Sequence, residues 1–84
     1  MSTRLFVGNL AEETTHAQLR ELFSTAGTVE SCRVIIDRTT GISKGFAFIE
    51  MTSVEAANAA VDKFNGTDFQ GKTMKVNEAR QRIS

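Results

Sequence analysis

The stretch Lys44–Met51, with the sequence KGFAFIEM, reads as a β-strand that is apolar on both of its sides. Successive side chains of a strand face opposite sides of its sheet. One side of this strand therefore carries an alanine, an isoleucine and a methionine, and the other carries Phe46 and Phe48 between a lysine and a glutamate. Either the strand is buried on both sides, or two phenylalanines are exposed for a functional reason. The elements available to cover the strand decide between these alternatives.

The chain has 84 residues, which is room for one domain. Helical spacing of apolar residues, capping residues and turn signals divide it into six elements. In chain order these are a strand over Arg4–Gly8, a helix from Thr15 to Gly27, a strand over Val29–Ile36, the strand described above, a helix capped by Ser53 and a strand over Lys72–Ala79. This order predicts an α+β, ferredoxin-like βαββαβ sandwich, in which a four-stranded antiparallel sheet has two helices on one face. We expect the domain to span residues 1–80 and a short polar tail to span 81–84.

Two helices can cover one face of this sheet, and the rest of the chain is too short to cover the other. If the aliphatic residues face the helices, then Phe6, Phe46 and Phe48 face solvent. The opposite register would bury charged side chains against the helices without partners, at a much larger cost. An exposed cluster of three aromatic residues indicates a binding surface. The residues expected to face the helices are Leu5, Val7, Cys32, Val34, Ala47, Ile49, Met74 and Val76, and the remaining phenylalanines, Phe23, Phe64 and Phe69, are expected in the core.

Charge and composition argue against several other functions. The ten lysines and arginines equal the ten acidic residues in number, which argues against a strong sequence-independent polyanion binder. The single cysteine cannot form an internal disulfide, and no apolar run is long enough to span a membrane. The N-terminal residues lead directly into the first strand rather than through a signal peptide, so we expect a cytoplasmic protein. With one histidine and no set of catalytic or metal-ligating residues, we expect no enzyme activity, no metal and no cofactor.

The octapeptide resembles a motif of the RNA recognition motif family, whose consensus is K/R-G-F/Y-G/A-F-V-x-F/Y. Seven of the eight positions fit when Ile49 is accepted for valine, and Met51 departs from the aromatic residue at the last position. Met51 falls on the side expected to face the core, so this departure leaves the other side intact. The first strand is similar to the family's hexapeptide over Leu5–Leu10, LFVGNL. Within the family, the chain is similar to small bacterial proteins with a single such domain, including those of cyanobacteria.

The resemblance implies that the chain binds single-stranded RNA, with bases stacked on aromatic residues of the sheet. It implies that Phe6 and Phe48 each stack on a base and that Phe46 lies against the sugars between them. Lys44, at the start of its strand, is expected to contact a phosphate. Stacking contributes roughly 1–3 kcal/mol per base, which predicts an affinity of about micromolar once association costs are subtracted. Strand alternation and the end of the last strand add further polar and basic candidates, namely Arg33, Lys75, Asn77, Arg80 and Arg82.

Two other functions remain open at this point, and a third, an enzyme, is argued against. The same fold can recruit a protein partner through its helices or a covered sheet, but the intact aromatic residues favour a nucleic acid. Single-stranded DNA is an alternative ligand, because stacking does not read the 2′-hydroxyl group. An acylphosphatase-like enzyme would share the topology, but the loop over residues 9–14 contains Glu12 and Glu13, which would repel a phosphate. We expect a monomer that binds neither a membrane nor a small-molecule substrate.

Overall fold

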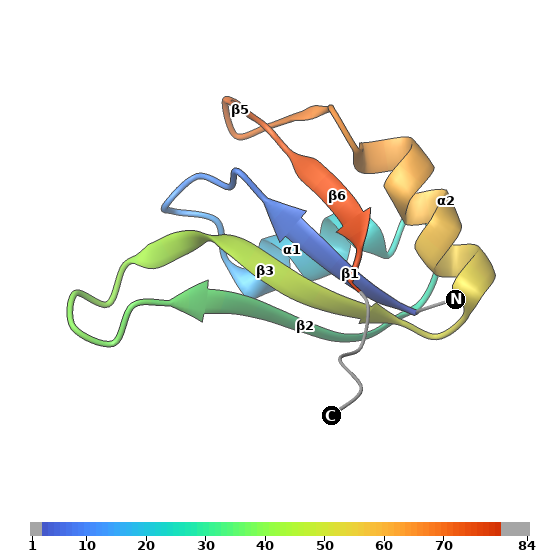
Figure 1. Ribbon diagram of the computed structural model, residues 1–84, viewed down its shortest axis with the longest axis horizontal. Helices are drawn as coiled ribbons and strands as arrows, with labels where there is room; N and C mark the ends of the chain where they lie inside the picture. Colours follow the sequence, from blue (N-terminus) through green and yellow to red (C-terminus); the bar gives the residue numbers. More distant parts are fainter. Residues whose placement is uncertain (1–2, 80–84) are drawn as a thin grey trace.

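One four-stranded antiparallel sheet, with two helices on one of its sides, forms the body of the computed structural model, which describes residues 3–79 (Figure 1). The strands of this sheet lie in the order β2-β3-β1-β6, and β4 and β5 form a separate two-stranded hairpin. The predicted βαββαβ arrangement is confirmed. In chain order the elements are β1 (Arg4–Gly8), α1 (His16–Phe23), β2 (Val29–Ile36), β3 (Ser43–Met51), α2 (Val54–Phe64), β4 (Asp68–Phe69), β5 (Lys72–Thr73) and β6 (Lys75–Glu78).

In Figure 1, α1 lies behind the sheet and α2 lies beside β6, and the face of the sheet turned to the viewer, which we call the open face, is covered by none of the described elements. The core fills the space between the sheet and the helices. Cys32 and Val34 are half-buried at its border, because β2 is an edge strand. The other residues predicted to face the helices are at most 1% exposed: Leu5, Val7, Ala47, Ile49, Met74 and Val76.

The phenylalanines outside the strands of the main sheet pack as predicted, with one difference of degree. Phe23 of α1 and Phe64 of α2 are buried, and their ring centroids lie 4.6 Å apart. Phe69 of β4 is half-buried and packs against the border of the core. These contacts join the two helices and the small hairpin to the same side of the sheet.

Side-chain caps start both helices where the sequence predicts them. Thr15 accepts a hydrogen bond from the amide of Gln18 at 3.2 Å, and the side chain of Gln18 accepts one from the amide of Thr15 at 3.0 Å. This capping box satisfies two amides that a helix start leaves without partners. Ser53 caps α2 in the same manner by accepting from the amide of Ala56 at 3.1 Å.

The end of α1 differs from the prediction, which extended the helix to Gly27. The helix ends at Phe23, and the hydroxyl groups of Ser24 and Thr25 donate to carbonyl oxygens of its last turn at 2.6 and 2.7 Å. A Cβ atom added to Gly27 would lie 2.5 Å from the Cβ of Ala56 in α2. Gly27 is therefore needed for close packing of this connection against α2, not as the end of a helix.

The last predicted strand, Lys72–Ala79, is divided at Met74. Its first part pairs with β4 and its second part pairs with β1. The amide of Met74 donates to the carbonyl oxygen of Thr67, and its own carbonyl accepts from the amide of Gly66, both at 2.8 Å. These bonds tie Met74 to the segment after α2, where its side chain is fully buried. The division turns the β4–β5 hairpin, which bends at Gly71 with a φ of 84°, away from the main sheet.

Among the described residues, neither helix is long and apolar enough to cross a membrane. The same part of the chain contains no group of three or more histidine, cysteine, aspartate or glutamate residues that could hold a metal ion.

Candidate nucleic-acid interface

Three phenylalanines form one cluster on the open face of the sheet. Phe6 of β1 lies 5.7 Å from both Phe46 and Phe48 of β3, and the latter two lie 6.2 Å apart, measured between ring centroids. The planes of Phe6 and Phe48 are inclined by 60°, and those of Phe46 and Phe48 by 83°. The rings are half-buried rather than fully exposed, because each packs against the other two. We call these three residues the aromatic cluster.

Strand pairing extends the aromatic cluster into a row across all four strands. Phe48 lies directly opposite Phe6 on one side and Arg33 of β2 on the other. Phe6 in turn lies opposite Asn77 of β6. Arg33 and Asn77 are exposed, so the row presents a cation, two aromatic rings and an amide on one face. The sequence prediction assigned all four residues to this face, and the register brings them together.

Gly8 makes room for the ring of Phe6. A Cβ atom added to Gly8 would lie 3.0 Å from the Cε1 atom of Phe6, which is tighter than nearly all real contacts of this kind. Lys75 lies directly opposite Gly8 on β6 and is exposed. A larger residue at position 8 would therefore have to displace the ring of Phe6.

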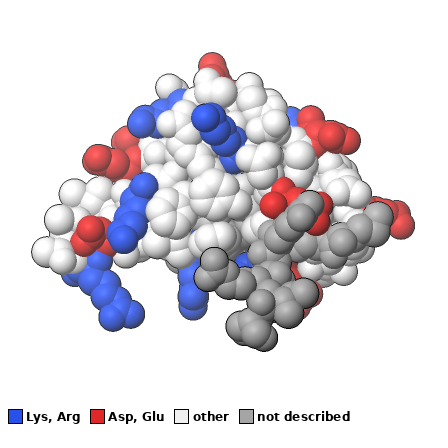
Figure 2. Space-filling view, viewed as in Figure 1, with Lys and Arg blue, Asp and Glu red and all other residues white. Residues whose placement is uncertain are grey.

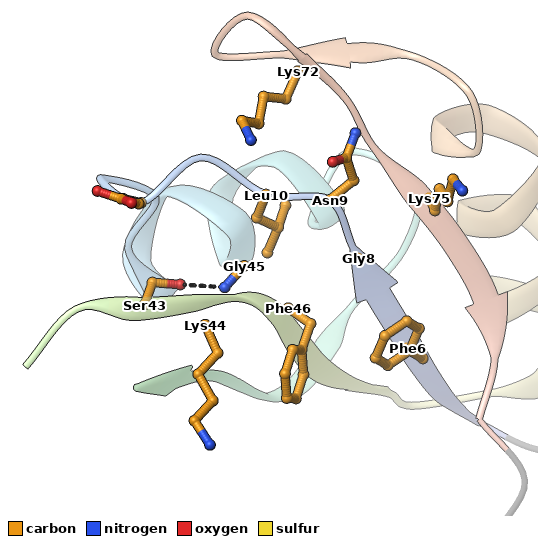
Figure 3. A pocket seen from close by; sticks show the side chains of 11 residues that line it. Phe6, Gly8, Asn9, Leu10, Ser43, Lys44, Gly45, Phe46, Lys72 and Lys75 are labelled. Carbon is orange, nitrogen blue, oxygen red and sulfur yellow. Dashed lines mark hydrogen bonds between the residues drawn. The ribbon is translucent and has the colours of Figure 1, made fainter. Parts of the chain in front are cut away.

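An open hollow of about 570 Å³ lies beside the aromatic cluster, between the β1–α1 connection and the start of β3. Phe6 and Phe46 form part of its lining, together with Lys44, Lys72 and Lys75. Figure 3 shows Lys72 of β5 extending toward the β1–α1 connection, whereas Lys44 extends from the start of β3 away from that connection. We call it the basic hollow, although it also includes the carboxylate of Glu12.

Positive φ angles and hydrogen bonds fix the segments that line the basic hollow. Asn9 has a φ of 59°, and its side-chain amide donates to the carbonyl oxygen of Thr73 at 2.6 Å, joining the end of β1 to β5. Gly45 has a φ of 87°, accepts from the amide of Leu10 at 2.8 Å and donates to the hydroxyl of Ser43 at 3.1 Å (Figure 3). A residue with a side chain would be strained at this φ, which explains the glycine of the octapeptide.

A second, smaller hollow of about 330 Å³ lies on the other side of Phe48. Arg4 and Glu50 line it, and the guanidinium carbon of Arg4 lies 5.1 Å from the centroid of the Phe48 ring. Thr3 donates from its hydroxyl to Glu50 Oε2 at 2.9 Å. Half-buried Cys32 also borders this hollow, and burial raises the pKa of its thiol, which therefore stays protonated at neutral pH.

The charges seen on this side of the molecule surround a largely uncharged centre. Figure 2 shows lysine and arginine side chains at the top, left and bottom of the visible face, and acidic residues both at the left and at the right. Lys44, Lys75 and Arg33 are all exposed, as predicted for residues that meet a ligand. Arg80 and Arg82, the remaining predicted candidates, lie outside the described residues.

The candidate list from the sequence omits three residues that the structure brings beside the aromatic cluster. Arg4 precedes Phe6 by two residues, so alternation along the first strand is a signal that identifies it. Lys72 and Asn9 carry no such signal. They reach the basic hollow only because the hairpin is turned at Met74 and because β1 ends in a residue with positive φ.

Residues 5–75 match the RNA recognition motif family. The chain belongs to this family. It is 45% identical over 83 residues to glycine-rich RNA-binding protein 3, mitochondrial, of Arabidopsis thaliana, covering 99% of this chain and 27% of that protein. It is 49% identical over 74 residues to the 33 kDa ribonucleoprotein, chloroplastic, of Nicotiana sylvestris, covering 88% of this chain and 23% of that protein.

Among solved structures, the fold superposes on an Sxl-lethal protein/RNA complex with a TM-score of 0.92 and 34% identity, covering 99% of this chain and 50% of that one. The chain spans about a quarter of the length of the Arabidopsis and Nicotiana relatives, 27% of the first and 23% of the second. Their names are those of RNA-binding proteins and ribonucleoproteins, and family membership supports a binding module rather than an enzyme.

Two sequence predictions are not supported by these relatives. The cytoplasmic location is contradicted, because the relatives are mitochondrial and chloroplastic proteins. A single cysteine does not distinguish the cytoplasm from other reducing compartments, so it was insufficient for the prediction. The narrower resemblance to small bacterial proteins is also unsupported, because the relatives come from Arabidopsis and Nicotiana.

Proposed function

We propose that this chain binds single-stranded RNA on the open face of its sheet. The observation that carries the proposal is the aromatic cluster, whose three half-exposed rings lie within 6.2 Å of one another on a face that no described element covers. Flat rings on a sheet offer stacking surfaces to bases that are not paired. The relatives named for RNA binding and the RNA complex of similar fold support the same ligand.

In this proposal Phe6 and Phe48 each stack on one base, and Phe46 lies against the sugars between them. Before RNA binds, the ring of Phe48 is partly covered, because the guanidinium carbon of Arg4 lies 5.1 Å from its centroid. An exposed cation–π contact contributes about 0.5–1 kcal/mol, whereas base stacking contributes about 1–3 kcal/mol. A base therefore takes the place of Arg4 over the ring.

Basic residues around the aromatic cluster contact the phosphates. Lys44 and Lys75 act from the basic hollow, joined by Lys72, and Arg33 acts from the opposite edge of the sheet. Asn77 pairs with a base edge, because its amide both donates and accepts hydrogen bonds. With zero net charge on the chain, we expect contacts to about two to four phosphates and an affinity of about micromolar. Arg80 and Arg82 are proposed as additional contacts beyond the last strand.

The domain proper is proposed to span residues 1–80, with a tail over 81–84, and to act as a monomer without a small-molecule substrate or a membrane. Single-stranded DNA remains the second candidate ligand, because the aromatic rings do not read the 2′-hydroxyl group. Recruitment of a protein through the helices would leave the aromatic cluster without a use, which makes it the weaker alternative.

The test is a titration of the backbone amide NMR signals with pools of short single-stranded RNA and with DNA of matched sequence. Binding at the open face shifts the amides of residues 6, 46 and 48 and their cross-strand neighbours. Shifts confined to α1 and α2, or no shifts at all, would refute the proposal. Fluorescence of the protein itself is unsuited to this, because the chain has no tryptophan or tyrosine.

A double substitution tests the role of the aromatic cluster. Replacing Phe46→Ala and Phe48→Ala together removes two rings, and affinity should fall at least about tenfold while the amide spectrum stays dispersed. Phe69→Ala is the matched control, since Phe69 is also half-buried but lies in β4, outside the main sheet. Equal affinities for the double variant and the control would show that stacking on these rings does not hold the RNA.

A further inference from the structure

Glu50 is a carboxylate on the face that we propose to bind a polyanion. It is half-buried and lies directly opposite Arg4 on β1 and Ser31 on β2. Phe48 precedes it by two residues on β3 and therefore faces the same side. All four residues line the hollow of about 330 Å³ beside the aromatic cluster. A base stacked on Phe48 would turn one edge toward Glu50.

A hydrogen bond from Thr3 orients the carboxylate of Glu50. The hydroxyl of Thr3 donates to Glu50 Oε2 at 2.9 Å, which restricts the rotation of the side chain. A carboxylate has about four acceptor positions on its two oxygens, so one donor leaves most of this capacity for a ligand. The arginines of the same hollow, Arg4 and Arg33, lower the electrostatic cost of bringing RNA close to the negative charge.

A phosphate is repelled by such a group, whereas a base edge that carries donors is attracted. Guanine presents two adjacent donors, N1–H and N2–H, and can form two parallel hydrogen bonds with a carboxylate. Cytosine and adenine present an amino group beside a ring nitrogen that accepts, which opposes the second carboxylate oxygen. Uracil presents a single N–H between two carbonyl groups. Charge-assisted, bidentate pairs are the strongest of these arrangements and the most selective.

We propose that Glu50 is a specificity-determining residue that selects guanine for the base stacked on Phe48. This inference rests on the proposed function, because it requires an RNA base on that ring. It assigns a role to Glu50, which among the described residues is the one acidic residue that lines the smaller hollow. The sequence preference then comes from strand β3 itself, two residues beyond the stacking ring.

The experiment measures fluorescence anisotropy of labelled RNAs that differ at the central base: UUGUU, UUAUU, UUCUU, UUUUU and UUIUU, where I is inosine. The wild-type chain should bind UUGUU about tenfold more tightly than UUUUU, as expected for a bidentate base contact. Inosine lacks the N2 amino group and should lose most of this preference. Glu50→Gln offers one acceptor and one donor, so its ratio of affinities for UUGUU and UUUUU should fall to within about threefold of unity.

Glu78→Gln is the control, because it removes the same charge from an exposed residue of β6 that lies opposite core residue Leu5. It should keep the guanine preference of the wild type. Equal binding of all five RNAs by the wild type, or a guanine preference that survives Glu50→Gln, would overturn the inference and leave the stacking proposal standing. Failure of the wild type to bind any of the RNAs would refute the proposed function, and with it this inference. The amide spectrum of each variant verifies that the chain remains folded.

Discussion

The two faces of the central sheet are made by the same strands and have opposite chemistry. Leu5 and Phe6 are neighbours in β1, yet the first is 0% exposed against the helices and the second is half-exposed on the open face. The same division recurs in β3 between Ile49 and Phe48. Strand alternation thus places core residues and residues of the proposed binding face next to each other along the chain. Substitutions on the two faces should therefore have effects of different kinds.

The largest expected effect is on the helix-facing side. Leu5→Ala removes a fully buried leucine from the core and should lower the free energy of unfolding by about 2–5 kcal/mol. Chemical denaturation followed by circular dichroism measures this change, since the chain lacks tryptophan and tyrosine. A loss smaller than about 1 kcal/mol would mean that the core collapses around the cavity and that the two faces are less distinct than proposed.

For Phe6, the neighbour of Leu5 in β1, the larger effect should be on RNA binding and the smaller one on stability. Phe6→Ala removes one stacking ring and should weaken RNA binding by about tenfold or more, because stacking contributes about 1–3 kcal/mol per base. The free energy of unfolding should fall less than for Leu5→Ala, because the ring of Phe6 is half-exposed and packs against the other two rings of the open face. If Phe6→Ala unfolds the chain as readily as Leu5→Ala does, the aromatic cluster is part of the core.

Alternation and element order were sufficient to predict the fold and which face carries each strand residue. The aromatic rings and Arg33, Lys75 and Asn77 could be assigned to one face because the period of a strand is two and the core face is defined by aliphatic residues. The register that aligns Arg33, Phe48, Phe6 and Asn77 in one row was beyond the sequence, because it depends on tertiary hydrogen bonds between strands distant in the chain.

Other features depend on local geometry that residue type does not encode. Lys72 reaches the basic hollow because Met74 leaves the last strand to bond with the segment after α2. Gly27 has the sequence signature of a helix end but serves the packing of a connection against α2. In both cases the local sequence pattern is typical of the predicted element, but a tertiary contact determines the structure that forms.

A smaller effect is expected on the salt dependence of RNA affinity, which should change when a lysine near the open face is removed but not when a lysine of a helix is removed. Lys72→Ala removes one cation from the basic hollow and should reduce the slope of log affinity against log salt concentration by about 0.7, the value for one phosphate of a single strand. Lys63→Ala is the control, because Lys63 lies on α2, where its Nζ is 3.3 Å from Thr25 Oγ1. A reduction of the slope by both variants alike would show that net charge, rather than position, governs the binding.

The smallest effect concerns the β2–β3 hairpin loop, which belongs to neither face. The amides of Thr39 and Thr40 donate to Asp37 Oδ1 at 2.7 and 3.4 Å, and these hydrogen bonds lower the pKa of the Asp37 carboxyl. A lowered pKa in the folded state means that the stabilisation is complete above the unfolded value, about 3.9, and is lost as the pH falls through the folded value. The amide shifts of residues 39 and 40 should therefore titrate with a midpoint below about 3.9.

In the same acid titration the amides of residues 6 and 48 should not follow this midpoint, because the loop and the aromatic cluster share no described hydrogen bond. Asp37→Asn keeps a side-chain acceptor but removes the titration, so the signals of residues 39 and 40 should lose that transition. A midpoint at or above the usual aspartate value would mean that the turn bonds are not formed in solution. A common transition at residues 6, 39 and 48 would show that the loop and the open face respond as one unit, and the separation of binding from the rest of the sheet would then be incomplete.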